Sequence, residues 1–68
     1  MKLTFLGTTS QGGSCPTLFA TDRDTYVIQG YRVLDAEALA QLDIPDHETC
    51  IEVPKALLKF AAAPQEPV

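Results

Sequence analysis

The sequence predicts a small α+β protein whose antiparallel sheet of about four strands is built on a central hairpin, residues 16–33. In this stretch two runs rich in Thr, Tyr, Val, Ile and Phe flank the polar tripeptide Asp22-Arg23-Asp24. Branched and aromatic residues suit a pleated, half-buried surface, and Asp tolerates turn geometry. Two further segments, 35–42 and 55–62, carry apolar residues at helical spacing and predict two short helices.

The length and composition predict one small domain with a thin core. The chain has 68 residues, of which 46% are hydrophobic, with three Phe, two Tyr and no Trp. We expect a single domain at 1–63, followed by a frayed tail at 64–68. A domain of this size buries only about 60% of the surface that its unfolded chain exposes, so it is marginal alone. We therefore expect a homo-oligomer or a stable partner.

The strands follow from alternation and from turn residues. Residues 2–6 alternate weakly and predict a first strand, which a loop rich in Gly and hydroxyl residues separates from the second strand at 17–21. The third strand is expected at 25–33 and the fourth at 49–53. The hairpin strands carry apolar side chains on both faces, so we expect both faces to be covered. Gly30 inside the third strand indicates a bulge or a close approach by another backbone.

The two helices have recognisable starts. Asp35 is a plausible N-cap, and Glu37 lies in the first turn, where the helix dipole favours an acidic side chain. Pro54 suits the first turn of the second helix. That helix has an apolar stripe of Leu57, Phe60 and Ala61, while its two lysines, Lys55 and Lys59, fall on the side expected to face water.

The charge restricts the classes of partner. Nine acidic and five basic residues give a formal charge of −4, which opposes direct nucleic-acid binding because phosphate neutralisation supplies much of that affinity. The same charge permits contact with a basic protein surface. No run approaches the roughly 20 apolar residues of a membrane span, and the short apolar N-terminus cannot form a signal-peptide core. We expect a cytoplasmic protein without a membrane partner.

Cys15, His47 and Cys50 are the residues from which a metal or thiol site could be built. Zinc normally takes four ligands, so the fourth would be Asp43, Asp46 or a residue of a symmetry mate. A thiolate–imidazole pair is also a known nucleophile, but so short a chain offers little material for a pocket. We expect no metal, no cofactor and no enzymatic activity. Free thiols in a reducing cytosol are preferred to a single disulfide.

The segment Ile51-Glu52-Val53-Pro54-Lys55-Ala56-Leu57-Leu58 resembles the signature of the swapped-hairpin family of transition-state regulators and antitoxins. The resemblance implies a DNA-binding dimer that interleaves its strands. In that family the motif lies near the N-terminus and hairpin strands follow it, whereas here only a tail follows and a basic surface is missing. A proline that opens a C-terminal helix explains the same residues.

A broader resemblance covers most of the chain. The stretches Gly12-Gly13-Ser14-Cys15-Pro16-Thr17-Leu18, Tyr26-Val27-Ile28-Gln29-Gly30-Tyr31 and Ile44-Pro45-Asp46-His47-Glu48-Thr49 are similar to short acidic actinobacterial proteins of unknown function. Such proteins are commonly encoded beside helix-turn-helix regulators. The resemblance includes no catalytic motif and implies a regulatory, cytoplasmic context.

Together these observations predict a non-enzymatic interaction module, an accessory partner of a DNA-binding regulator that acts through protein–protein contacts. One alternative is a DNA-binding antitoxin or transition-state regulator of the swapped-hairpin type. The other is a small metal-binding or thiol-active protein that uses Cys15, His47 and Cys50. The residues predicted to contact a partner are Asp22, Asp24, Tyr31, Glu52, Leu57 and Phe60.

Overall fold

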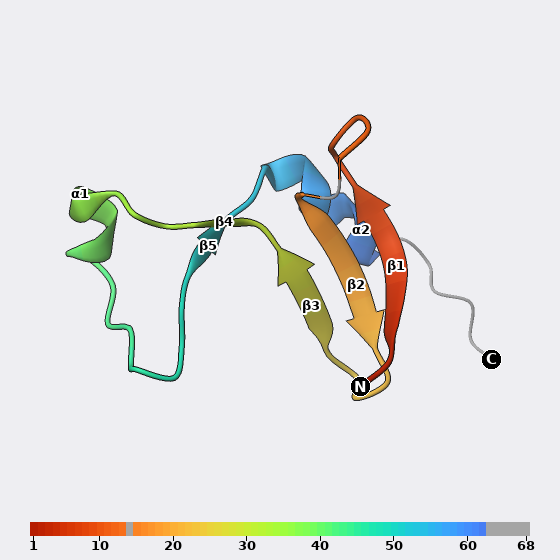
Figure 1. Ribbon diagram of the computed structural model, residues 1–68, viewed down its shortest axis with the longest axis horizontal. Coiled ribbons are helices and arrows are strands. Elements are labelled where there is room, and N and C mark those ends of the chain that lie inside the picture. The colour runs from red at the N-terminus through yellow and green to blue at the C-terminus, as the bar shows by residue number, and fades with distance from the viewer. Residues whose placement is uncertain (14, 63–68) are drawn as a thin grey trace.

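The fold combines two small antiparallel sheets with short helices, which confirms the predicted α+β class (Figure 1). The computed structural model describes residues 1–13 and 15–62. The first sheet has the order β1-β2-β3, formed by Leu3–Thr8, Thr17–Thr21 and Tyr26–Gln29. The second pairs β4 (Tyr31–Arg32) with β5 (Ile51–Glu52). The helical elements are α1 (Ala36–Leu39), the 3₁₀ turn η1 (Lys55–Leu58) and α2 (Lys59–Ala62).

Gly30 divides the strand that we predicted at 25–33. The residues before it form β3 in the first sheet, and those after it form β4 in the second. A Cβ at Gly30 would lie 2.6 Å from Cγ1 of Val53 and 3.1 Å from the carbonyl oxygen of Glu52. The close backbone approach expected there is confirmed, but the single long strand is wrong. The predicted fourth strand is likewise reduced to β5.

The first strand is longer than the sequence indicated, because Gly7 and Thr8 belong to β1 and not to a loop. The register against β2 shifts between Phe5 and Gly7, which marks a bulge. The ring of Phe60 occupies the space into which a Cβ at Gly7 would project. The absent side chain at Gly7 therefore lets α2 pack directly on β1.

The turn between β2 and β3 forms where the polar tripeptide predicted it. The backbone N–H of Thr21 donates to the carbonyl oxygen of Thr25 at 3.0 Å. The hydroxyl of Thr21 accepts from the backbone N–H of Arg23, also at 3.0 Å. Asp24 adopts φ = 60°, a left-handed conformation that Asp tolerates better than most residues.

Both predicted helices are present, the first in shortened form and the second over its whole predicted range 55–62. Asp35 is the N-cap of α1, as expected, and its carboxylate accepts from the backbone N–H of Ala38 at 2.9 Å. After Leu39 the chain turns through i→i−3 bonds, so the helix ends before the predicted boundary at residue 42. The predicted helix at 55–62 begins as 3₁₀ and becomes α-helical at Lys59.

The core lies on one face of the three-stranded sheet. Leu18 on β2 and Leu57 on η1 are 1% and 0% exposed, and Figure 1 shows η1 and α2 together on one side of the sheet. The hydroxyl of Tyr26 reaches the carbonyl oxygen of Ala61 at 3.4 Å on that same side. On the opposite face Phe5 is 59% exposed and Leu3 is 47% exposed, whereas Thr17 at the start of β2 is only 3% exposed. The expectation that both faces are covered is therefore wrong for the part of this face around Leu3 and Phe5.

Residues 33–50 form an arm that extends away from this sheet (Figure 1). The backbone N–H of Val33 donates to the carbonyl oxygen of Cys50 at 3.0 Å, which joins the two ends of the arm. The radius of gyration is 13.7 Å, compared with about 11 Å for a compact chain of this length. The arm gives the molecule its elongated shape, 42 × 28 × 18 Å. The tail predicted at 64–68 lies outside the described residues.

Candidate interaction surfaces

The uncovered side of the β1-β2-β3 sheet, here called the open face, is apolar. Phe5 pairs with Phe19, and Phe19 pairs with Val27, so these side chains project from the same side of the sheet. The two Phe rings meet edge to face, with centroids 6.3 Å apart and an interplanar angle of 77°. Phe5 remains 59% exposed and Leu3 47% exposed. The aromatic cluster therefore faces solvent instead of filling a core.

The open face carries no charge at the strand positions that the structure describes. By register and alternation Thr17, Thr21 and Gln29 project from the same side, but Thr17 is only 3% exposed, so this end of the face is covered. A contiguous apolar surface without charged residues differs from an ordinary protein exterior, where isolated apolar residues are scattered among polar ones. It is typical of a surface that another element or molecule covers.

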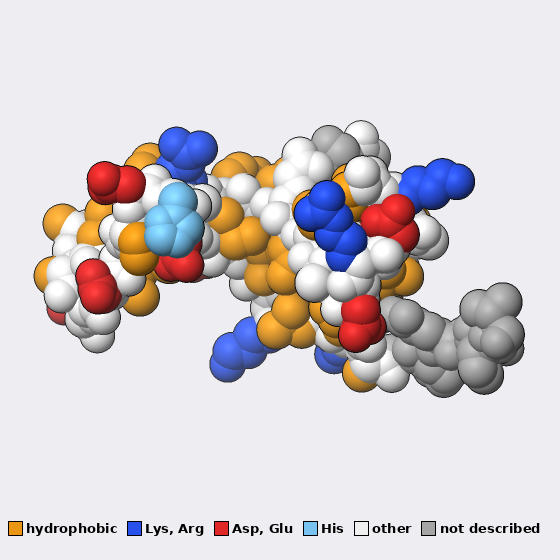
Figure 2. Space-filling view, turned by 90° about the horizontal axis from the view of Figure 1, so that it is seen from below, with side chains coloured by type: hydrophobic (Ala, Val, Ile, Leu, Met, Phe, Trp, Pro, Cys, Tyr) orange, Lys and Arg blue, Asp and Glu red, His pale blue; other side chains and the backbone are white. Residues whose placement is uncertain are grey.

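The arm, unlike the open face, is strongly acidic. Five of the nine acidic residues fall within residues 33–50, and none of the five Lys and Arg residues does. The remainder of the chain has four acidic and five basic residues, a net charge of +1, so the arm carries more than the whole net charge of −4. Figure 2 shows acidic side chains alternating with exposed hydrophobic ones along the arm. The acidic residues are Asp35, Glu37, Asp43, Asp46 and Glu48.

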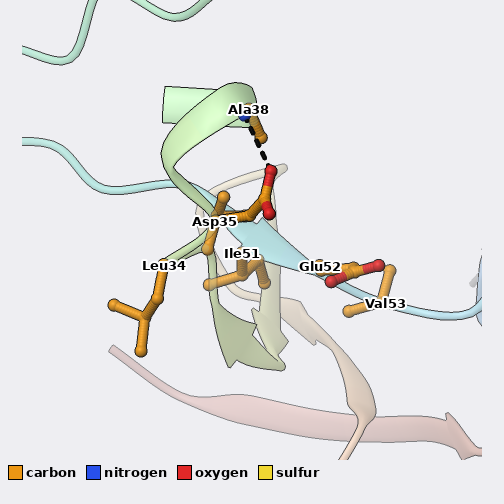
Figure 3. A pocket seen from close by; sticks show the side chains of 7 residues that line it. Leu34, Asp35, Ala38, Ile51, Glu52 and Val53 are labelled. Carbon is orange, nitrogen blue, oxygen red and sulfur yellow. Dashed lines mark hydrogen bonds between the residues drawn. The ribbon is translucent and has the colours of Figure 1, made fainter. Parts of the chain in front are cut away.

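A groove of about 660 Å³ lies where the arm meets the second sheet. Its lining includes Leu34, Asp35 and Ala38 from the arm, and Ile51 and Glu52 of β5 with the following Val53 (Figure 3). The Asp35 carboxylate is turned towards the Ala38 amide that it caps. Leu34, at the rim, is 77% exposed. The groove is open and mixed in polarity, which suits a protein segment better than a small molecule.

The six predicted partner-binding residues fall into two groups. Asp22 and Asp24 are exposed in the β2–β3 turn, while Tyr31 and Glu52 pair across β4 and β5 and are also exposed. All four are available to a partner. The other two, Leu57 and Phe60, pack against the sheet: Leu57 is fully buried, and Phe60 is partly buried over Gly7. Their apolar stripe supplies the core and not a docking surface.

Cys15, His47 and Cys50 are the residues considered for metal or thiol chemistry. The described residues contain no group of three or more His, Cys, Asp or Glu side chains that could hold a metal ion. Cys15 and Cys50 are free and partly buried, and the Cys15 thiol lies 4.0 Å from the carbonyl oxygen of Gln29. His47 is exposed on the arm, 3.8 Å from the Glu48 carboxylate.

The basic side chains do not form a single patch. Figure 2 shows the Lys and Arg side chains of the visible face separated from one another. Lys55 and Lys59, the candidate phosphate contacts of the DNA-binding alternative, are exposed on η1 and α2. Across the part of the chain that the structure describes, each helix is too short to cross a membrane.

Comparisons of the chain with protein-family models, with curated proteins and with solved structures gave no match. The case for function therefore depends on the surfaces described above.

Sequence reasoning missed two features of these surfaces. The first is the exposed part of the sheet around Leu3 and Phe5, because apolar alternation does not say which face of a sheet will be covered. The acidic arm was hidden in the overall charge of −4. Counting charges separately for residues 33–50 would have revealed it.

Proposed function

We propose that the protein is a non-enzymatic interaction module of the cytoplasm, an accessory partner that binds a DNA-binding regulator through protein–protein contacts. The observation that carries the proposal is the arm, which combines five acidic residues, no Lys or Arg, and exposed leucines. The resemblance to short actinobacterial proteins encoded beside helix-turn-helix regulators supports the choice of partner.

The arm has the chemistry needed to bind a basic protein surface. Proteins that bind DNA present Lys and Arg to the phosphates, so a regulator of this class offers the complementary charge. Opposite charges accelerate the encounter and select the partner, whereas apolar contacts hold the complex together. Leu34, Leu39 and Leu42 are exposed beside the acidic residues and would supply those apolar contacts.

The test compares two variants that change the charge of different surfaces by two units. Glu37→Gln with Asp43→Asn removes two negative charges from the arm and leaves the Asp35 cap in place. Lys55→Gln with Lys59→Gln removes two positive charges from η1 and α2. Each variant is titrated against a purified helix-turn-helix regulator as the proposed partner, with association rates measured at low and high salt.

We expect the arm variant to associate about 3- to 10-fold more slowly at low salt, with a smaller difference at high salt because salt screens the steering. The lysine variant should associate as the unmodified protein does. In the swapped-hairpin alternative, the lysines would contact phosphates and their loss would weaken DNA binding and its salt dependence. If the two lysines are required for a DNA complex while the double variant of the arm associates at an unchanged rate, the interaction-module proposal fails.

A further inference from the structure

We propose that a second copy of this chain covers the open face, so that the protein is a two-fold dimer whose β1-β2-β3 sheets pack against each other. The contact would be centred on Phe5 and Phe19, with Leu3 and Val27 beside them. This inference concerns the sheet and not the arm, and it does not depend on the function proposed above.

The isolated chain buries very little. Among the described residues, Leu18 and Leu57 are the only large side chains that are fully buried, and both belong to the same side of the sheet. All five aromatic side chains are exposed or partly exposed. Small domains with a core of this size usually require a further source of stability. Because that need is permanent, a second copy, which is always present with the first, meets it better than a transient partner.

The exposure of the open face fits such an interface. Phe5 is 59% exposed and Leu3 is 47% exposed. A second sheet packed on this face would remove these apolar side chains from water, which stabilises the contact in proportion to the apolar area covered.

The distribution of charge favours the sheet over the arm as the place where two copies meet. Pairing through the arms would bring together two segments of charge −5, which repel each other. Pairing through the open faces brings together strand positions without charged residues. These strands belong to the part of the chain outside the arm, whose net charge is only +1, so the two copies repel each other little there. The arms stay free in such a dimer and remain available for a basic partner.

The geometry of sheet packing makes the contact self-complementary. Two sheets pack face to face about 10 Å apart, with their strands roughly aligned, and their inner side chains interdigitate. In a two-fold interface the same patch of each copy meets the other. The edge-to-face pair of Phe5 and Phe19 in one copy would then lie against the same pair in its mate.

The test measures the mass of the protein in solution by sedimentation equilibrium over a range of micromolar concentrations. We expect the unmodified chain to sediment at the dimer mass. Phe5→Ser should raise the dissociation constant at least about 100-fold, because each dimer loses two buried Phe side chains. The matched control is Leu34→Ser, which removes a more exposed apolar side chain from the arm and should leave the dimer intact.

Circular dichroism checks that Phe5→Ser remains folded, and Leu3→Ser provides a second variant of the open face at the start of β1. A mixture of isotope-labelled and unlabelled copies of the unmodified protein then reports contacts between chains by NMR. Intermolecular signals from Phe5 and Val27 would support the inference. A chain that is monomeric at every concentration would overturn it, as would a dimer that Leu34→Ser dissociates or whose intermolecular signals come from the arm alone.

Discussion

Replacing Leu57 by Ala should nearly abolish folding, whereas the same replacement at its neighbour Leu58 should be tolerated. Leu57 is 0% exposed and Leu58 is 52% exposed, although both belong to η1. The pair is matched in residue type, in helical element and in the size of the deletion. Any difference between the two variants therefore reports on burial and not on helix propensity.

The size of the effect follows from the size of the core. Truncation of a buried Leu to Ala costs about 2–5 kcal/mol, from lost transfer energy and from the cavity that is left. A chain of 68 residues has a total stability of only about 3–10 kcal/mol. With Leu18 the one remaining fully buried large side chain among the described residues, little can collapse into the cavity. At the half-exposed Leu58 the cost should stay near 1 kcal/mol or below.

Urea unfolding followed by circular dichroism measures both variants. Because m-values for small proteins are about 1 kcal/mol per M, Leu57→Ala should lower the midpoint by 2 M or more, or be unfolded from the start. All samples are compared at one protein concentration, since association would contribute to stability. Equal shifts for the two variants, or a midpoint for Leu57→Ala within experimental error of the unmodified protein, would refute the assignment of the core to this face.

Three further predictions test separate contacts. Gly7→Ala should lower the free energy of unfolding by about 1–3 kcal/mol, because the added Cβ meets the Phe60 ring. The double variant with Phe60→Ala should lose less stability than the two single variants added together, and a strictly additive loss would argue against the contact. Charge reversal at Asp22, Asp24 or Glu52 should slow association with the regulator in stopped-flow measurements, whereas an unchanged rate would exclude these residues as contacts. Excess chelator should leave the far-ultraviolet spectrum unchanged; a loss of structure together with bound zinc by elemental analysis would show a metal requirement.

Local chemistry made the β2–β3 hairpin and the start of α1 predictable. The polar tripeptide beginning at Asp22 turns the chain because Thr21 satisfies the nearby backbone groups and Asp24 accepts a left-handed conformation. Asp35 caps α1 through a hydrogen bond to a residue three positions later. Both features depend on residues within four positions of one another, so the sequence contains all the information that they require.

Contacts between distant segments decided what the sequence could not predict. Gly30 separates β3 from β4 because Glu52 and Val53, more than twenty positions away, approach its backbone. Apolar residues on both sides of the hairpin strands predict two covered faces. The contacts of η1 with β2 and of α2 with β1 bury Leu18, whereas Phe5 on the other side of the sheet stays 59% exposed. The same alternation is compatible with a monomer core and with a dimer contact, so periodicity alone does not distinguish them.

The acidic arm and the uncharged open face are separate surfaces, so changing the salt concentration can distinguish the two proposed contacts. A contact made by the acidic arm with a basic partner should weaken as salt rises, because opposite charges are screened from each other. A contact between open faces contains no charged strand residues among those described, so its apolar part should persist or strengthen in sulfate or phosphate. Salt would also reduce the repulsion between the two arms of a dimer, each of charge −5. Opposite salt responses of dimer mass and partner association would mean that the chain uses different surfaces for the two interactions, whereas loss of the dimer as salt rises would show that attraction between opposite charges holds the two copies together and would contradict an apolar contact between the open faces.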